Sequence, residues 1–329
     1  MQERNLYEDI QNEVFIRLIE KERVKKTAFK IGIAYLLLLF IPMLFSYLFV
    51  WGASFFRFNT SKVLSDPAFQ NIWQITVSIT MMIIPAIFLI KAEKRHIGEI
   101  ISFGKPEKKL FLPFILIGVG VCAFANIATN VIAIFLEDFG IYYSAPSLAK
   151  PNGFFGTILL IISTAITPAL VEEFLMRGAV LGSLKKFGED IAVLISAVMF
   201  SLMHANILQI PFAFIVGLIL GFAAIKTGSI WTGIAIHFIN NFMSVLLSDL
   251  LTFGGSDIIK NATTTIYFAI SLLLAFVGIL MIPQEEKDAF KLEKGEMRAT
   301  FKEKLGWFLT SPAIIICIAI SVLMTAEIL

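Results

Sequence analysis

The sequence predicts an all-α polytopic membrane protein: a helical bundle of about nine transmembrane helices (eight to nine), with a cytoplasmic N-terminus. Three observations carry this prediction. Of the 329 residues, 57% are hydrophobic and 16% are charged, whereas about a quarter of a soluble domain is charged. The mean hydropathy of +0.84 indicates too much apolar surface for a single soluble core. The apolar residues also come in blocks of about 20, the length of a helix that crosses a bilayer.

Composition argues against several classes of function. The net charge of +2 is too small to attract a polyanion, so we expect no nucleic-acid partner. The two cysteines, Cys122 and Cys317, lie far apart in apolar runs, and this spacing provides neither a redox pair nor a metal-binding framework. A soluble enzyme, a nucleic-acid-binding module and a disulfide scaffold are therefore poor interpretations.

The N-terminal segment, residues 1–28, is dense in charges of both signs, so it is not a cleavable signal peptide. Leu6, Ile10, Val14 and Leu18 recur at intervals of four, which places them on one face of a helix. We expect an amphipathic helix at the cytoplasmic surface of the membrane. A short solvated helix that only anchors the chain is the simpler alternative.

The spanning segments fall into three groups along the chain. Three lie within residues 29–136, four form a core within 154–250, and two lie within 251–329 together with a charged cytoplasmic loop. Their expected bounds, in chain order, are about 29–51, 72–90, 110–136, 154–184, 191–206, 210–225, 229–249, 265–283 and 307–326.

Lysine and arginine predict the orientation, because basic loops remain on the cytoplasmic side. With the N-terminus inside, the cytoplasmic segments hold 23 of the 27 Lys and Arg residues, and the outside connections hold 4. We therefore expect an integral protein of the plasma membrane whose C-terminus lies outside.

Polar groups at membrane depth point to function, because an ionisable side chain there costs at least about 2.5 kcal/mol and needs a partner or a purpose. Nearly all nine segments are free of charge away from their ends. The exceptions lie in the fourth, fifth and seventh segments; they are Glu172, Glu173, Arg177, His204, His237, Asn240 and Asn241.

Helical spacing divides the acidic pair of the fourth segment. Glu173 can pair with Arg177, because residues four apart are neighbours on a helix. Glu172 is turned about 100° away and has no cation on its own helix. We expect the Glu173–Arg177 pair to be structural and Glu172 to face a cavity. Pro168, four residues before Glu172, removes a ladder hydrogen bond and can kink the helix there.

The other polar residues share faces and depth with this group. Phe200 lies beside His204, and His237 lies beside Asn241, each pair four residues apart. Glu172, His204 and Asn241 each lie 13 or 14 residues, about 20 Å, from the expected cytoplasmic end of their helices. Three helices thus carry polar groups to a common level, which predicts one shared site.

The polar residues form three motifs, each in an apolar helix; in chain order they are Glu172-Glu173-x-x-x-Arg177, Phe200-x-x-x-His204 and His237-x-x-x-Asn241. These three motifs, in this order, resemble those of the CPBP family, which comprises the type II CAAX prenyl endopeptidases and the bacteriocin-processing or Abi proteins. The resemblance spans about residues 154–250.

Amide hydrolysis requires an activated water, a proton donor for the leaving amine and donors for the developing oxyanion. Glu172 and His204 can hold and deprotonate a water, and His237 and Asn241 can offer N–H donors to the oxyanion. The resemblance implies the same roles and a glutamate-type intramembrane endopeptidase with no covalent acyl-enzyme. It also implies a membrane-associated peptide substrate, prenylated or bacteriocin-like, and a site that opens toward the cytoplasm or sideways to membrane lipid.

Two alternatives remain open at this stage. Glu172, His204 and His237 are a ligand set typical of catalytic zinc, although the sequence lacks the H-E-x-x-H pair on one helix; we expect no cofactor. The second alternative is a non-catalytic membrane protein, an immunity factor or scaffold, in which the same polar groups only lock the bundle.

Overall fold

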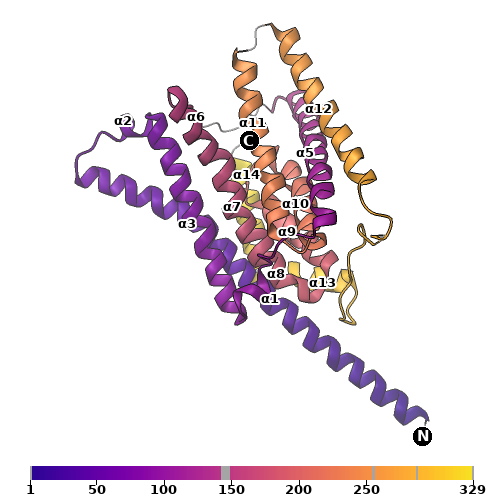
Figure 1. The fold of residues 1–329 in the computed structure, drawn as a ribbon. Helices are drawn as coiled ribbons and strands as arrows, with labels where there is room; N and C mark the ends of the chain where they lie inside the picture. The colour runs from indigo at the N-terminus through magenta and orange to yellow at the C-terminus, as the bar shows by residue number, and fades with distance from the viewer. Residues whose placement is uncertain (1, 142–148, 254–255, 287, 328–329) are drawn as a thin grey trace.

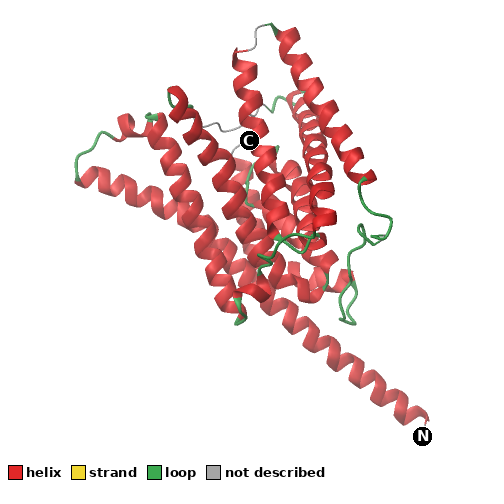
Figure 2. Cartoon of the chain, in the orientation of Figure 1, coloured by secondary structure: helices red, strands yellow, loops and turns green. Residues whose placement is uncertain are grey.

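The computed structural model describes residues 2–141, 149–253, 256–286 and 288–327, and that part of the chain is helical with no strands (Figure 2). The all-α prediction is therefore confirmed. The α-helices are α1 (Gln2–Phe55), α2 (Thr60–Leu64), α3 (Pro67–Glu93), α4 (Ile97–Ile100), α5 (Lys108–Glu137), α6 (Gly153–Ile161), α7 (Thr167–Glu173), α8 (Leu181–Leu184), α9 (Glu189–Leu202), α10 (Gln209–Lys226), α11 (Ile230–Phe253), α12 (Asp257–Leu280), α13 (Phe301–Leu309) and α14 (Pro312–Glu327).

Seven helical runs in the described part of the chain are long and apolar enough to cross a membrane. The pair α13 and α14, bent by 71°, makes an eighth if it is one broken span. The expected fifth span, 191–206, is α9, whose 14 residues reach about 21 Å and do not cross a hydrocarbon core of about 30 Å. The count of nine is therefore not confirmed, and the orientation stays a prediction.

Helix α1 joins two elements that the sequence analysis separated. No Gly or Pro interrupts the chain before Gly32, so the N-terminal segment runs into the first span as one helix of 54 residues. Figure 1 shows its indigo end projecting away from the bundle. The side chains of residues 1–10 lie outside the described part, while Val14 and Leu18 are exposed. Binding of this face to the membrane surface stays a prediction.

The helical run from 153 to 187 is not a regular α-helix. Two π-helical turns, η1 (Ile162–Ile166) and η2 (Phe174–Val180), flank α7, and a 3₁₀ turn, η3 (Lys185–Phe187), ends the run. Pro168 lies in the first turn of α7, where its missing N–H is tolerated. Such π turns are frequent at functional sites, and these two lie on either side of Glu172.

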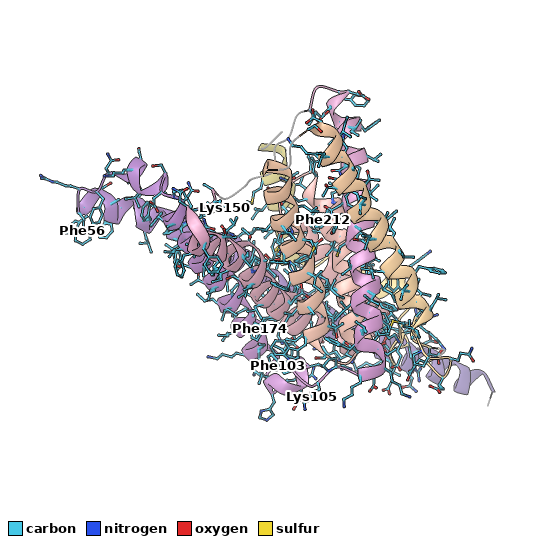
Figure 3. The ribbon with its side chains drawn as sticks, turned by 45° about the horizontal axis from the view of Figure 1, so that its top comes forward. Phe56, Phe103, Lys105, Lys150, Phe174 and Phe212 are labelled. Atoms are coloured by element: carbon cyan, nitrogen blue, oxygen red, sulfur yellow. The ribbon has the colours of Figure 1, made fainter. Side chains whose placement is uncertain are left out.

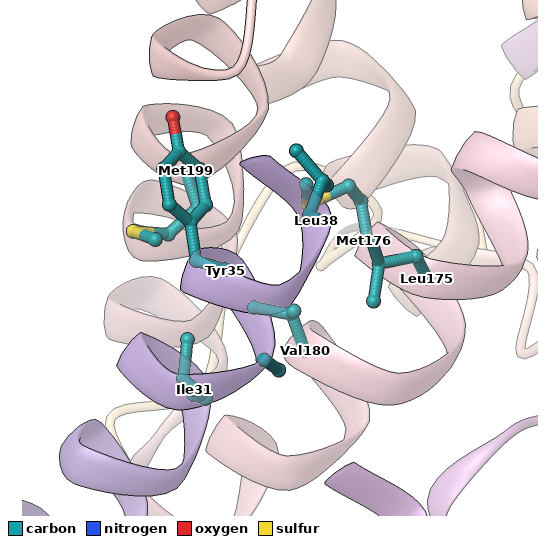
Figure 4. Close-up of a pocket in the computed structure, with 8 residues that line it drawn as sticks. Ile31, Tyr35, Leu38, Leu175, Met176, Val180 and Met199 are labelled. Carbon is teal, nitrogen blue, oxygen red and sulfur yellow. The ribbon is translucent and has the colours of Figure 1, made fainter. Parts of the chain in front are cut away.

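Helix α1 packs against the second π turn, η2. Figure 4 shows side chains of α1 facing those of η2 and α9 across a narrow apolar seam. Tyr35 of α1 also shares a hydrogen bond of 2.8 Å with Ser321 of α14. The seam residues are Ile31, Tyr35, Leu38, Leu175, Met176, Val180 and Met199.

Helices α9 and α10 pack at close range. A Cβ added to Gly217 of α10 would lie 3.0 Å from the Cα of Ala197 in α9, so a larger residue there would fit only if the neighbouring atoms moved by a few tenths of an ångström. The contact brings the first half of α10 against the segments that carry the polar groups, because α10 also packs on α11 and η2.

The charged loop between α12 and α13 is tied to the rest of the molecule by buried side chains. Both carboxylate oxygens of Glu20 in α1 accept backbone N–H groups of residues 298–299 at 2.9 Å. The buried Lys304 donates to the carbonyl oxygens of Phe187 and Lys294 at 2.7 and 2.9 Å. The loop therefore connects α1, at Glu20, to the end of the helical run that contains α7, at Phe187.

Candidate active site

A cavity of about 230 Å³ lies among α7, the turn after α9, α10 and α11. All four predicted catalytic residues and Phe200 line it. Figure 3 shows Phe212, another wall residue, well away from the end of the bundle where Phe103 and Lys105 lie. The lining residues are Pro168, Glu172, Phe200, His204, Gln209, Phe212, Ala213, Val216, His237, Asn240 and Asn241.

Glu173 and Arg177 form the ion pair that their spacing predicts. Arg177 Nη1 lies 2.8 Å from Glu173 Oε1, and both side chains are fully buried. Arg177 Nη2 donates to the carbonyl oxygen of Gly217 at 3.1 Å. The pair thus joins η2 to α10, and it lies behind the cavity wall rather than among the lining residues.

His237 links the two neighbouring glutamates. Its Nδ1 lies 3.0 Å from Glu173 Oε1, and its Nε2 lies 4.0 Å from Glu172 Oε2. The sequence analysis paired His237 only with Asn241. No spacing within one helix indicates the contact with Glu173, because the two residues belong to different helices.

His204 does not lie within a spanning helix as predicted. Helix α9 ends at Leu202, and His204 occupies the following turn, before Ala205, whose φ is +45°. Its Nδ1 lies 2.8 Å from the carbonyl oxygen of Phe200. A carbonyl can only accept, so Nδ1 carries a hydrogen, and in the neutral ring Nε2 then presents its lone pair. In the turn that leads into α10, the side-chain oxygen of Asn206 accepts the backbone N–H groups of residues 208–209.

Phe200 packs among three charged or titratable side chains. Its ring makes edge-to-face contacts with His204 at 5.0 Å and with His237 at 5.9 Å between ring centroids. Arg177 Cζ lies 4.4 Å from the centre of the same ring, within the range of a cation–π contact. The Phe200 ring is therefore in contact with both imidazoles and with the buried guanidinium.

A chain of amides orients Asn241. Its Nδ2 donates to the carbonyl oxygen of Thr164 in η1 at 3.2 Å, and its Oδ1 accepts from Asn240 Nδ2 at 3.0 Å. Because the Thr164 carbonyl can only accept, it fixes the direction of both amides. The sequence analysis noted Asn240 as a polar residue at depth but gave it no role, and it did not find Thr164.

The described side chains do not form a metal-binding site. Of the residues that the structure describes, no group of three or more His, Cys, Asp or Glu is arranged to hold a metal ion. Glu172, His204 and His237, the set named for zinc, line the same cavity without forming such a group. The expectation of no cofactor stays a prediction.

Three polar atoms in or behind the cavity wall have no hydrogen-bond partner within the described part of the chain. They are Glu173 Oε2, Arg177 Nε and Asn240 Oδ1. Most buried polar atoms in proteins are paired. The positions of these three atoms are therefore not explained by hydrogen bonds to neighbouring groups.

Comparison with protein families supports the resemblance read from the motifs. Residues 154–243 match the family model described as type II CAAX prenyl endopeptidase Rce1-like. Comparison with curated proteins and with solved structures found no match. The matched segment is about a quarter of the chain, and it contains all seven candidate site residues. Residues 154–243 of this integral membrane protein are therefore similar to the Rce1-like type II CAAX prenyl endopeptidases, in agreement with the resemblance that the motifs predicted.

Proposed function

We propose that this protein is a glutamate-type intramembrane endopeptidase. The Rce1-like segment indicates a peptidase with a peptide substrate in a membrane context. The observation that carries the finer proposal is that Glu172, His204, His237 and Asn241 line one cavity among apolar helices. These four residues supply a base, a second water ligand and two oxyanion donors.

Glu172 and His204 hold the attacking water. Glu172 keeps 16% of its side chain exposed, while Glu173 beside it has none, so Glu172 is the carboxylate that water can reach. His204 presents Nε2 because Nδ1 is committed to the carbonyl of Phe200. Glu172 takes one proton from the water, His204 Nε2 accepts a hydrogen bond from it, and the oxygen attacks the peptide carbonyl carbon.

Asn241 and His237 stabilise the tetrahedral oxyanion. One N–H of Asn241 is held by Thr164, which leaves the second N–H of the same amide for the substrate oxygen. His237 Nδ1 faces the Glu173 carboxylate, so its Nε2 donates only when the ring carries two protons. Collapse of the intermediate breaks the C–N bond, and the proton held by Glu172 passes to the leaving amine.

The substrate class follows from the family and the setting. The family description names CAAX prenyl endopeptidases, so a lipid-anchored peptide with a C-terminal CAAX box is the first candidate and a bacteriocin-like peptide the second. A lipid anchor would deliver such a peptide to a site at membrane depth. We place the protein in the plasma membrane, with the cavity opening toward the cytoplasm or sideways to lipid.

A comparison of membrane peptides tests the proposal. Cells that produce the parent protein or the Glu172→Gln variant are compared by mass spectrometry of peptide termini. We expect an uncut precursor to accumulate with Glu172→Gln. The matched control is Glu99→Gln, an exposed carboxylate in α4, which should leave the peptide pattern unchanged. Identical patterns for parent and Glu172→Gln, at equal protein levels, would contradict a proteolytic function and favour the non-catalytic scaffold.

A further inference from the structure

Gly233 in α11 lies one helical turn before His237 and two turns before Asn241. Residues at this spacing share one face of a helix. The face therefore presents, in order, a glycine, an imidazole and an amide toward α7 and η1, with which α11 is in contact. The Gly233 position was not part of the motifs read from the sequence.

A side chain at position 233 would be too close to a single group, the Glu173 carboxylate. An ideal Cβ placed there lies 2.9 Å from Glu173 Oε2, closer than real Cβ contacts allow. The next neighbours are the carbonyl oxygen of Leu220 at 3.6 Å and Glu173 Cδ at 3.7 Å, which are ordinary contact distances. Close approach of two helix backbones, the usual reason for a membrane glycine, therefore does not explain this position.

The carboxylate at this contact cannot move freely. Its Oε1 is bonded to Arg177 Nη1 at 2.8 Å and to His237 Nδ1 at 3.0 Å. Its Oε2 is buried with no hydrogen-bond partner among the described residues. Any displacement of Oε2 therefore rotates the carboxylate about the two hydrogen bonds that Oε1 accepts. The hydrogen bond from His237 should give way first, because Arg177 is also held by its hydrogen bond to the carbonyl oxygen of Gly217.

We propose that Gly233 is a positioning residue: the space it leaves seats the Glu173 carboxylate so that this carboxylate fixes the orientation of the His237 ring. The effect on cleavage rests on the proposed function, whereas the effect on His237 does not. A methyl group at position 233 would push Glu173 Oε2, loosen the bond to His237 Nδ1 and move His237 Nε2 relative to Glu172 Oε2, now 4.0 Å away.

The first test uses nuclear magnetic resonance of the full-length protein in nanodiscs with ¹⁵N-labelled histidine. The chain has three histidines, so the His237 signals can be assigned from a His237→Gln variant. We expect Gly233→Ala to shift the Nδ1 resonance of His237 and to leave those of His96 unchanged. The matched control is Gly178→Ala, whose Cβ would lie 2.9 Å from the tip of Ile101, a hydrocarbon. An unshifted His237 resonance in folded Gly233→Ala protein would overturn the proposal.

The second test measures cleavage of a fluorogenic prenylated peptide ending in a CAAX box. We expect Gly233→Ala to lower kcat at least about tenfold with little change in KM, because a misplacement of about 1 Å can cost about a hundredfold in rate. Gly178→Ala should keep the parent kcat. Folding should survive, since Ala favours a helix more than Gly does.

A shorter carboxylate at position 173 distinguishes a positioning role of Gly233 from a general loss of structure. Glu173→Asp withdraws the acid group from Gly233. Alone it should lower kcat, but combined with Gly233→Ala it should restore part of the lost kcat and move the His237 resonance back toward its parent position. A double variant no better than Gly233→Ala in either measurement would contradict the proposal. If the parent itself fails to cleave the peptide, the proposed substrate class is wrong, and the resonance shift still decides the role of Gly233.

Discussion

His237 Nε2 lies 4.0 Å from Glu172 Oε2, so one imidazole connects the carboxylate that lines the cavity with the carboxylate buried behind it. Glu172 and Glu173 are adjacent in the chain, yet the first faces the cavity and the second faces Arg177. Their substitutions should therefore fail in different ways, and that difference separates a catalytic site from a structural lock.

Glu172→Gln should abolish cleavage and leave the melting temperature near that of the parent, because Gln keeps the shape of the residue but cannot take a proton. Glu173→Gln should lower stability by about 3–5 kcal/mol, because it leaves Arg177 as a buried charge without its counterion. Thermal unfolding in detergent and cleavage of the prenylated peptide check both outcomes. Equal destabilisation by the two variants would favour the non-catalytic interpretation.

Phe200→Leu should lower stability by about 2 kcal/mol, because it removes the ring under Arg177 and leaves space between two imidazoles. Cleavage should fall as well, since His204 and His237 both rest on that ring. The control is Phe222→Leu, in α10, whose ring stacks on that of Phe290 and lies tilted against that of Phe114. A smaller loss for Phe200→Leu than for Phe222→Leu, measured by thermal unfolding, would argue against the cation–π contact.

Contacts within one helix were predictable from the sequence, whereas contacts between helices were not. The spacing of four residues identified the Glu173–Arg177 pair and the Phe200–His204 neighbours. The bond from His237 to Glu173 depends on how α11 is rotated against α7, and apolar side chains on all faces of a membrane helix do not specify that rotation.

The end of α9 was misplaced for a related reason. The apolar run continues past Leu202, so hydropathy alone extended the helix beyond His204. The available signal was Asn206, a residue type that favours turns and helix N-caps, which lies in the turn just before the start of α10. The π turns around α7 also escape a search for 3.6-residue periodicity, since each widens the turn without changing the apolar composition.

Removal of metal should not affect cleavage. We expect the purified protein to retain its activity after treatment with a chelator and to hold no stoichiometric metal by elemental analysis, because Glu172 and His204 activate the water without a Lewis acid in the proposed mechanism. Adding zinc after chelation distinguishes the alternatives. Activity that is lost with chelator and restored by zinc would assign Glu172, His204 and His237 to a zinc site instead.

Ser163→Ala should affect the site through η1, which packs on α3. Asn71 of α3 donates both its N–H groups to backbone carbonyls, one of them that of Ala149, so its Oδ1 accepts from Ser163 in η1. Without the hydroxyl this buried acceptor is unpaired, which costs about 1–3 kcal/mol. The next residue, Thr164, holds Asn241, so loosening of η1 should also lower kcat more than it changes KM. The control is Ser78→Ala, also in α3, whose hydroxyl accepts a hydrogen bond from Gln74. A loss of stability with unchanged kcat in Ser163→Ala would show that η1 does not orient Asn241.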